Sequence, residues 1–127
     1  MLLVMAAKSK KATAKELRPR FRVLCGDDIA LGPGKVELLA AIQQTGSINE
    51  AAKHMGMSYM RAWTLIKTME RCFKEPLVSA LRGGTAGGGA QLTETGRQAL
   101  ALYQQMQNES LAASRNTWRK IQELLLD

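Results

Sequence analysis

Apolar and polar positions alternate where the patterned part of the chain begins, and this alternation predicts a β-hairpin. Phe21, Val23 and Cys25 occupy every second position, a Gly-Asp-Asp stretch at 26–28 interrupts the pattern, and apolar residues then resume. A period of two is typical of a strand that turns one face to a core. Residues 1–16 show no usable period, so we expect a disordered basic arm there and ordered structure from about residue 17.

Helical periodicity replaces the alternation after a Gly-Pro-Gly turn at 32–34. Apolar residues at helical spacing predict a first helix over about 35–45, with Gly46 as its C-terminal cap. Ser47 and Glu50 have the Ser-x-x-Glu spacing of a capping box, in which a hydroxyl and a carboxylate satisfy backbone donors at a helix start. A second helix is therefore predicted to begin at Ser47.

A third helix is predicted after a very tight turn at Gly56, because Ser58 offers the next N-cap. A short helix, a glycine turn and a second capped helix form the helix-turn-helix arrangement. Ala52 and Ala62 stand on either side of Gly56, where that motif needs small, buried residues. The predicted buried face of the third helix, at steps of four, three and four, consists of Ala62, Ile66, Met69 and Phe73.

The opposite face of the third helix predicts contact with DNA. Its basic residues have no acidic residue on the same stripe, and small uncharged residues stand between them, as a helix needs in a major groove about 12 Å wide. Glu70 lies to one side. The ordinary alternative is a solvated face, which the preceding helix and turn disfavour. The residues of this predicted face are Met60, Arg61, Thr64, Lys67, Thr68 and Arg71.

A glycine-rich segment between two short strands predicts the wing of a winged helix. The strands are expected at 77–81 and 91–93, and five glycines lie between them. Glycines such as Gly83 and Gly84 would let backbone amides approach a phosphate or the minor groove, with Arg82 at the base of the wing. A nucleotide-binding loop is disfavoured, because GxxxxGK[ST] needs a Lys and a hydroxyl residue that open a helix, and neither is present.

One long helix is predicted from Thr93 to about Leu126. At 1.5 Å per residue it would extend about 50 Å, more than a small domain buries. The alternative is a core helix with a frayed end, but large apolar side chains near the C-terminus would then face water. We therefore expect a dimerisation helix whose interface consists of Leu100, Tyr103, Leu111, Trp118, Ile121 and Leu125.

These elements predict an α+β, mostly helical fold: a winged helix-turn-helix with an N-terminal β-hairpin and a long C-terminal dimerisation helix. We expect a basic arm at 1–16, the DNA-binding domain at 17–93 and the dimerisation helix at 94–127.

Composition narrows the function further. Of 18 basic and 11 acidic residues, seven basic and one acidic fall within the first 22 positions, so the rest of the chain is near neutral. A basic arm of this kind is as often a solvated tail as a phosphate-binding segment. No apolar run reaches the roughly 18 residues that cross a bilayer. Two cysteines are too few for a disulfide framework. Together with the single His54 they are also too few ligands for a zinc site. We expect a cytoplasmic protein with no metal and no cofactor.

Two other functions compete with sequence-specific DNA binding. The first is an enzyme, but the sequence offers no recognisable set of catalytic residues. His54 has no paired nucleophile, and no two carboxylates stand at a catalytic spacing. A non-specific nucleoid or RNA-binding protein would use the basic arm without reading bases. The few aromatic residues argue against stacking on single strands.

The motifs together resemble the N-terminal domain of ModE-type molybdate-responsive transcription regulators, over about residues 17–107. More distantly, the chain is similar to the winged helix of LysR-type regulators. The combination of the Ser-Tyr-x-x-Ala-Trp stretch with the glycine pattern is specific. The residues that carry the resemblance are Gly32-Pro33-Gly34-Lys35, Gly46-Ser47-Ile48, Ala51-Ala52, Met57-Ser58-Tyr59, Ala62-Trp63, Gly83-Gly84, Gly87-Gly88-Gly89-Ala90, Leu92-Thr93 and Gly96.

The resemblance implies roles for individual residues and for partners. It places Ser58, Tyr59, Met60, Arg61 and Thr64 toward double-stranded DNA, and Lys67, Arg71 and Arg82 on phosphates. Trp63 is assigned to packing beneath the wing. It also implies a homodimer that binds an inverted repeat near molybdenum-related genes.

Full-length regulators of this type add molybdate-binding domains, for which 127 residues leave no room. We therefore expect that these residues alone do not bind molybdate, and that a separate effector protein would have to supply any response.

Overall fold

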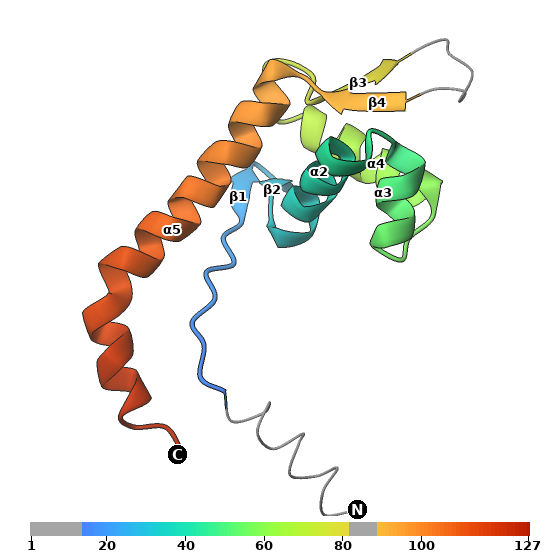
Figure 1. Cartoon of the computed structure of the whole chain (residues 1–127). Helices are drawn as coiled ribbons and strands as arrows, with labels where there is room; N and C mark the ends of the chain where they lie inside the picture. Colours follow the sequence, from blue (N-terminus) through green and yellow to red (C-terminus); the bar gives the residue numbers. More distant parts are fainter. Residues whose placement is uncertain (1–13, 82–88) are drawn as a thin grey trace, which may run out of the picture. The chain divides into compact units, whose positions relative to one another are not determined.

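The computed structural model describes residues 14–81 and 89–127, and it confirms the mostly helical winged-helix fold (Figure 1). One compact unit is Arg20–Met106; Gln107–Asp127 belongs to a second unit with the residues up to Pro19. The elements in chain order are β1 (Val23–Cys25), β2 (Asp28–Leu31), α2 (Pro33–Thr45), α3 (Ile48–His54), α4 (Tyr59–Glu70), β3 (Val78–Leu81), β4 (Gly89–Leu92) and α5 (Glu94–Gln122).

The two predicted hairpins are both present as antiparallel strand pairs. In the first, Cys25 is paired with Asp28, and Gly26 adopts a φ of 61° in the turn between them. In the second, Val78 is paired with Leu92 and Leu81 with Gly89. The predicted start of the last strand at residue 91 was two residues late, because Gly89 and Ala90 were read as part of the glycine-rich loop. Ala90 is buried, and its N–H donates to the Gly46 carbonyl at 2.9 Å.

The helix starts follow the predicted caps, with two differences. Gly32 is the N-cap of α2, so the helix begins at Pro33, two residues earlier than predicted. Proline suits this first position because its missing N–H would have no partner inside the helix. Ser47 Oγ accepts from the Glu50 N–H at 3.1 Å, as a capping box requires. The second bond of a capping box, from the Ser47 N–H to the Glu50 carboxylate, is replaced: the Ser47 N–H donates to Thr45 Oγ1 at 3.3 Å.

The buried face of α4 is confirmed over three of its four predicted residues. Ala62, Ile66 and Met69 are buried, whereas Phe73 is only partly buried and follows the helix, which ends at Glu70. Backbone hydrogen bonds between residues three positions apart replace the α-helical bonds there, because the Phe73 N–H donates to the Glu70 carbonyl. The core of the compact unit also contains large, fully buried residues of α2 and of the segment before β3: Leu38, Leu39, Ile42 and Leu77.

The long helix α5 begins as predicted and ends four residues earlier than predicted, at Gln122. Thr93 Oγ1 caps it by accepting from the Gly96 N–H at 3.0 Å. Gly96 is buried against the segment before β3, and a Cβ atom on it would lie 2.2 Å from the Leu77 carbonyl oxygen. Only glycine therefore allows this close approach of α5 to the second hairpin.

Candidate nucleic-acid interface

The helix-turn-helix is formed by α3 and α4, which are joined by a left-handed turn. Gly56 has a φ of 66°, a conformation that favours glycine, and the Met57 N–H donates to the Ala52 carbonyl at 3.0 Å. Ala52 and Ala62 are 1% and 0% exposed, which confirms them as the small residues where the two helices meet. Figure 1 shows α2, α3 and α4 grouped together, and α3 contacts both of the other helices.

The first turns of α4 present the predicted DNA-facing residues to solvent. Ser58 Oγ accepts from the Arg61 N–H at 3.1 Å and so caps the helix. Tyr59 and Met60 are 45% and 64% exposed, and Arg61 and Thr64 are exposed as well. Met60, Arg61 and Thr64 line a shallow hollow of about 240 Å³. These side chains can therefore reach a ligand without any change in the helix.

Lys67 lies on the same face, but Glu70 binds it. Its Nζ is 3.3 Å from Glu70 Oε1 and 5.4 Å from the centre of the Trp63 ring. The Lys67 side chain is 51% exposed, whereas that of Glu70 is 12% exposed. Because the ammonium group is open to water, the ion pair is screened, and Lys67 can turn toward a phosphate.

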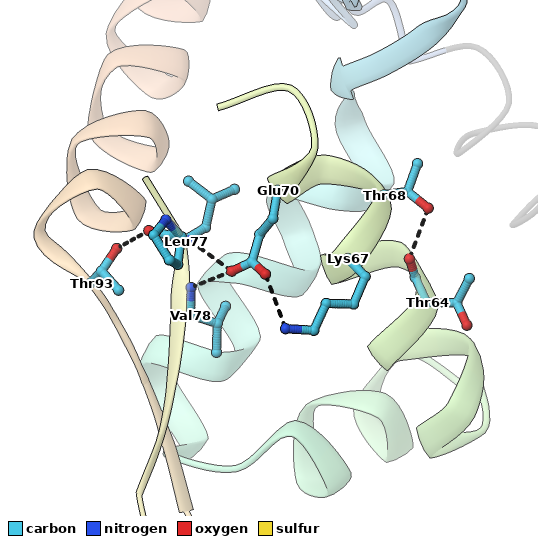
Figure 2. A network of polar contacts seen from close by, with 8 residues as sticks. Thr64, Lys67, Thr68, Glu70, Leu77, Val78 and Thr93 are labelled. Atoms are coloured by element: carbon cyan, nitrogen blue, oxygen red, sulfur yellow. Dashed lines mark hydrogen bonds and ion pairs between the residues drawn. The ribbon is translucent and has the colours of Figure 1, made fainter. Parts of the chain in front are cut away.

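Glu70 has a second role that the sequence analysis missed. Its Oε2 accepts hydrogen bonds from the Leu77 N–H at 2.8 Å and the Val78 N–H at 3.1 Å (Figure 2). The carboxylate thus joins the end of α4 to the start of β3. An acidic residue in the last turn of a helix is unfavourable in the field of the helix dipole. The position of Glu70 in the sequence could therefore have indicated a partner outside the helix.

Thr68 differs from the rest of the predicted face. It is only half-exposed, and its hydroxyl donates to the Thr64 carbonyl at 2.9 Å within the helix (Figure 2). A hydroxyl bonded back to its own helix has little left to offer a base.

Arg71 follows α4 and is shared with the first hairpin. Its Nη2 is 3.4 Å from Asp28 Oδ1, and both side chains are largely open to water.

The next residue, Cys72, also lies close to the first hairpin. Burial, a hydrogen bond with the Cys25 thiol and nearby negative charge raise the pKa of the Cys72 thiol. The end of α4 is therefore anchored to β2 as well as to β3.

The predicted wing residues Arg82, Gly83 and Gly84 lie outside the described residues. The described strands β3 and β4 border a concavity of about 370 Å³ beside the starts of α3 and α4. Ser47, Asn49 and Tyr59 contribute its polar groups. The second hairpin and the two helices of the motif thus share one surface.

The predicted dimer residues, on α5 and just after it, separate into two groups. Leu100 and Tyr103 are 4% and 2% exposed in the single chain, and the Tyr103 hydroxyl donates to the Phe21 carbonyl at 2.7 Å. They belong to the core of the compact unit, so the structure contradicts their assignment to a dimer interface. Leu111, Ile121 and Leu125 are exposed, and Trp118 is half-exposed.

Among residues 14–81 and 89–127, no helix is long and apolar enough to cross a membrane. The same residues contain no group of three or more His, Cys, Asp or Glu side chains that could hold a metal ion.

Comparison with known proteins identifies the family. Residues 34–97 match the bacterial regulatory helix-turn-helix proteins of the lysR family. The molybdenum transport protein ModE of Azotobacter vinelandii is 45% identical over 84 residues, which cover 66% of this chain and 31% of that protein. The DNA-binding transcriptional dual regulator ModE of Escherichia coli K12 is 41% identical over 71 residues, which cover 56% of this chain and 27% of the relative. These relatives confirm the predicted resemblance.

The matched region spans less than a third of the length of these relatives. A solved structure of Lactococcus lactis ZitR, the E41A mutant, superposes with a TM-score of 0.52 at 13% identity, over 98% of this chain and 90% of that one. That likeness concerns the fold alone. The family match covers half of the 127 residues, and the chain therefore belongs to the bacterial regulatory helix-turn-helix proteins of the lysR family.

Proposed function

We propose that the protein is a sequence-specific DNA-binding transcription regulator of molybdenum-related genes. The observation that carries this proposal is the exposed start of α4, where Met60, Arg61 and Thr64 lie open to solvent after the tight turn at Gly56. Arg61 forms no ion pair among the described residues, so its guanidinium is free to bind the edge of a guanine. The named functions of the ModE relatives support the choice of target genes.

In this proposal α4 enters the major groove with Ser58, Tyr59, Met60, Arg61 and Thr64 facing the bases. Lys67 and Arg71 bind phosphates after leaving their carboxylate partners Glu70 and Asp28. Arg82, Gly83 and Gly84 would add contacts from the wing.

A homodimer is the second part of the proposal. Beyond Met106, exposed apolar side chains that water disfavours lie on α5 and just after its end, among them Leu111, Ile121 and Leu125. A symmetric dimer would place two copies of α4 about 34 Å apart, one turn of DNA, and bind an inverted repeat. A chain truncated before Ala112 should sediment as a folded monomer that binds DNA weakly, whereas a dimeric truncated chain would place the interface elsewhere.

The test of the function compares a promoter fragment from a molybdenum-related gene with scrambled duplex and with RNA. Arg61→Ala should cost about 1 to 3 kcal/mol on the cognate site and relax the preference at one base step. Lys67→Ala should weaken all duplexes alike and reduce the magnitude of the salt slope by about one. Equal affinity for all three nucleic acids would instead favour the nucleoid or RNA-binding alternative.

A further inference from the structure

A cationic concavity opens beside the first turn of α2. Its volume is about 250 Å³. Arg22, Lys35 and Arg61 line it together with the apolar residues Ile29, Met57 and Leu65. The three basic residues come from three separate parts of the fold: the segment before β1, helix α2 and helix α4.

The charge of this concavity is not neutralised by the protein. No carboxylate lines it, and none of its three basic side chains takes part in an ion pair among the described residues. Lys35 Nζ donates to the Ile29 carbonyl, a neutral acceptor that leaves the charge of the ammonium group uncompensated. Three like charges around one hollow repel each other, so the site favours an anion.

The concavity also adjoins the face of α4 that the proposed function assigns to DNA. Arg61 and Leu65 line both this concavity and the hollow beside Met60 and Thr64. A DNA strand that contacts α4 would therefore pass its mouth. A hollow lined by both basic and apolar side chains suits a deoxyribose with its phosphate better than a small inorganic anion, which offers nothing for apolar side chains to contact.

We propose that this concavity seats one sugar-phosphate unit of the DNA, with Arg22 and Lys35 on the phosphate and Ile29, Met57 and Leu65 against the sugar. This inference rests on the proposed function, and it extends the interface from the helix-turn-helix to the N-terminal hairpin. Arg22 gains a specific role that the helix-turn-helix motif does not indicate.

The test removes the charge of Arg22 and compares it with a neighbour. Arg22→Gln should reduce the magnitude of the salt slope by about 0.9 and lower affinity roughly eightfold at about 0.1 M salt, for cognate and scrambled duplex alike. Arg20→Gln removes the same charge from the same segment, outside the concavity, and should leave the slope unchanged. Thermal denaturation of both variants checks that the hairpin is intact.

A backbone scan locates the contact. Replacing single phosphates of the duplex by neutral methylphosphonates should reveal one position where the wild type loses affinity and Arg22→Gln does not. Lys35→Gln should be insensitive at the same position. If Arg22→Gln and Arg20→Gln behave alike, or if no such position exists, the inference fails while the Arg61→Ala effect still supports the proposed function. Failure of the wild type to bind duplex DNA overturns both.

A free oxyanion is the other source of the same chemistry, and a separate titration distinguishes it. Calorimetry of the DNA-free chain with sodium phosphate, sulfate and molybdate should give no binding below the millimolar range. Micromolar binding that Arg22→Gln abolishes would make the concavity a small-anion site and overturn its assignment to DNA.

Discussion

The link between α4 and β3 through Glu70 makes a quantitative prediction about stability. Glu70→Ala leaves the N–H groups of Leu77 and Val78 without their acceptor, in a region where Leu77 is fully buried. Hydrogen bonds to a charged group contribute about 1.5 to 3 kcal/mol each, and a buried donor left unpaired costs about 1 to 3 kcal/mol. We expect Glu70→Ala to lower the free energy of unfolding by about 3 kcal/mol.

Glu70→Gln separates the backbone bonds from the ion pair. Its amide oxygen can still accept from both N–H groups, whereas the charge that binds Lys67 is gone. Because Lys67 is half-exposed, that ion pair contributes no more than about 1 kcal/mol. Glu70→Gln should therefore cost about 1 kcal/mol, and Lys67→Ala less.

Urea denaturation followed by circular dichroism measures these differences. With an m value of about 2 kcal/mol per molar, Glu70→Ala should lower the midpoint by roughly 1.5 M at unchanged m. Glu75→Ala is the matched control, because Glu75 is an exposed carboxylate five residues away. If both alanine variants unfold at the same midpoint, the carboxylate does not hold β3. If Glu70→Gln costs as much as Glu70→Ala, the negative charge of Glu70, rather than its oxygen as a hydrogen-bond acceptor, stabilises the link between α4 and β3.

Three further predictions test other contacts. Gly96→Ala should cost about 2 to 3 kcal/mol in thermal denaturation, because its Cβ would meet the Leu77 carbonyl at 2.2 Å, whereas Gly34→Ala, with open space around it, should not destabilise. Tyr103→Phe removes the hydrogen bond to the N-terminal segment and should cost about 1 kcal/mol. Burial raises the Tyr103 pKa in the folded chain, so the stability of the wild type should fall as the pH rises from the usual tyrosine pKa through the raised one, and Tyr103→Phe should lose this part of the pH dependence. Because the Cys72 pKa is raised, iodoacetamide should alkylate Cys72 more slowly in the folded chain than in guanidinium at pH 8.

Local signals in the sequence were sufficient for most of the fold. Ser47, Ser58 and Thr93 each cap a helix through the N–H group three residues on, and a cap of this kind depends only on nearby residues. Gly46 and Gly56 adopt the left-handed conformation that ends or separates helices. The period of α4 likewise predicted its buried residues as far as the helix extends.

The sequence could not show which polar groups meet across the fold. The capping box at Ser47 is half formed because Thr45 competes for the same N–H, and Glu70 is bonded to residues seven and eight positions away. The concavity beside α2 combines residues as distant as Arg22 and Arg61. Long-range partners of this kind depend on how the elements pack, and no periodicity encodes them.

Helix α5 shows why an amphipathic pattern alone does not define an interface. The apolar pattern continues from Leu100 past the end of the helix to Leu125, and the sequence offered one interpretation for all of these positions. The structure divides them: Leu100 and Tyr103 are already covered by the chain itself, whereas Leu111, Ile121 and Leu125 are exposed. Only an uncovered residue gains by meeting a second copy, so Leu111, Ile121 and Leu125 can stabilise the proposed dimer, whereas Leu100 and Tyr103 cannot. Substitutions there should change the oligomeric state, and substitutions at Leu100 should change the stability of the fold.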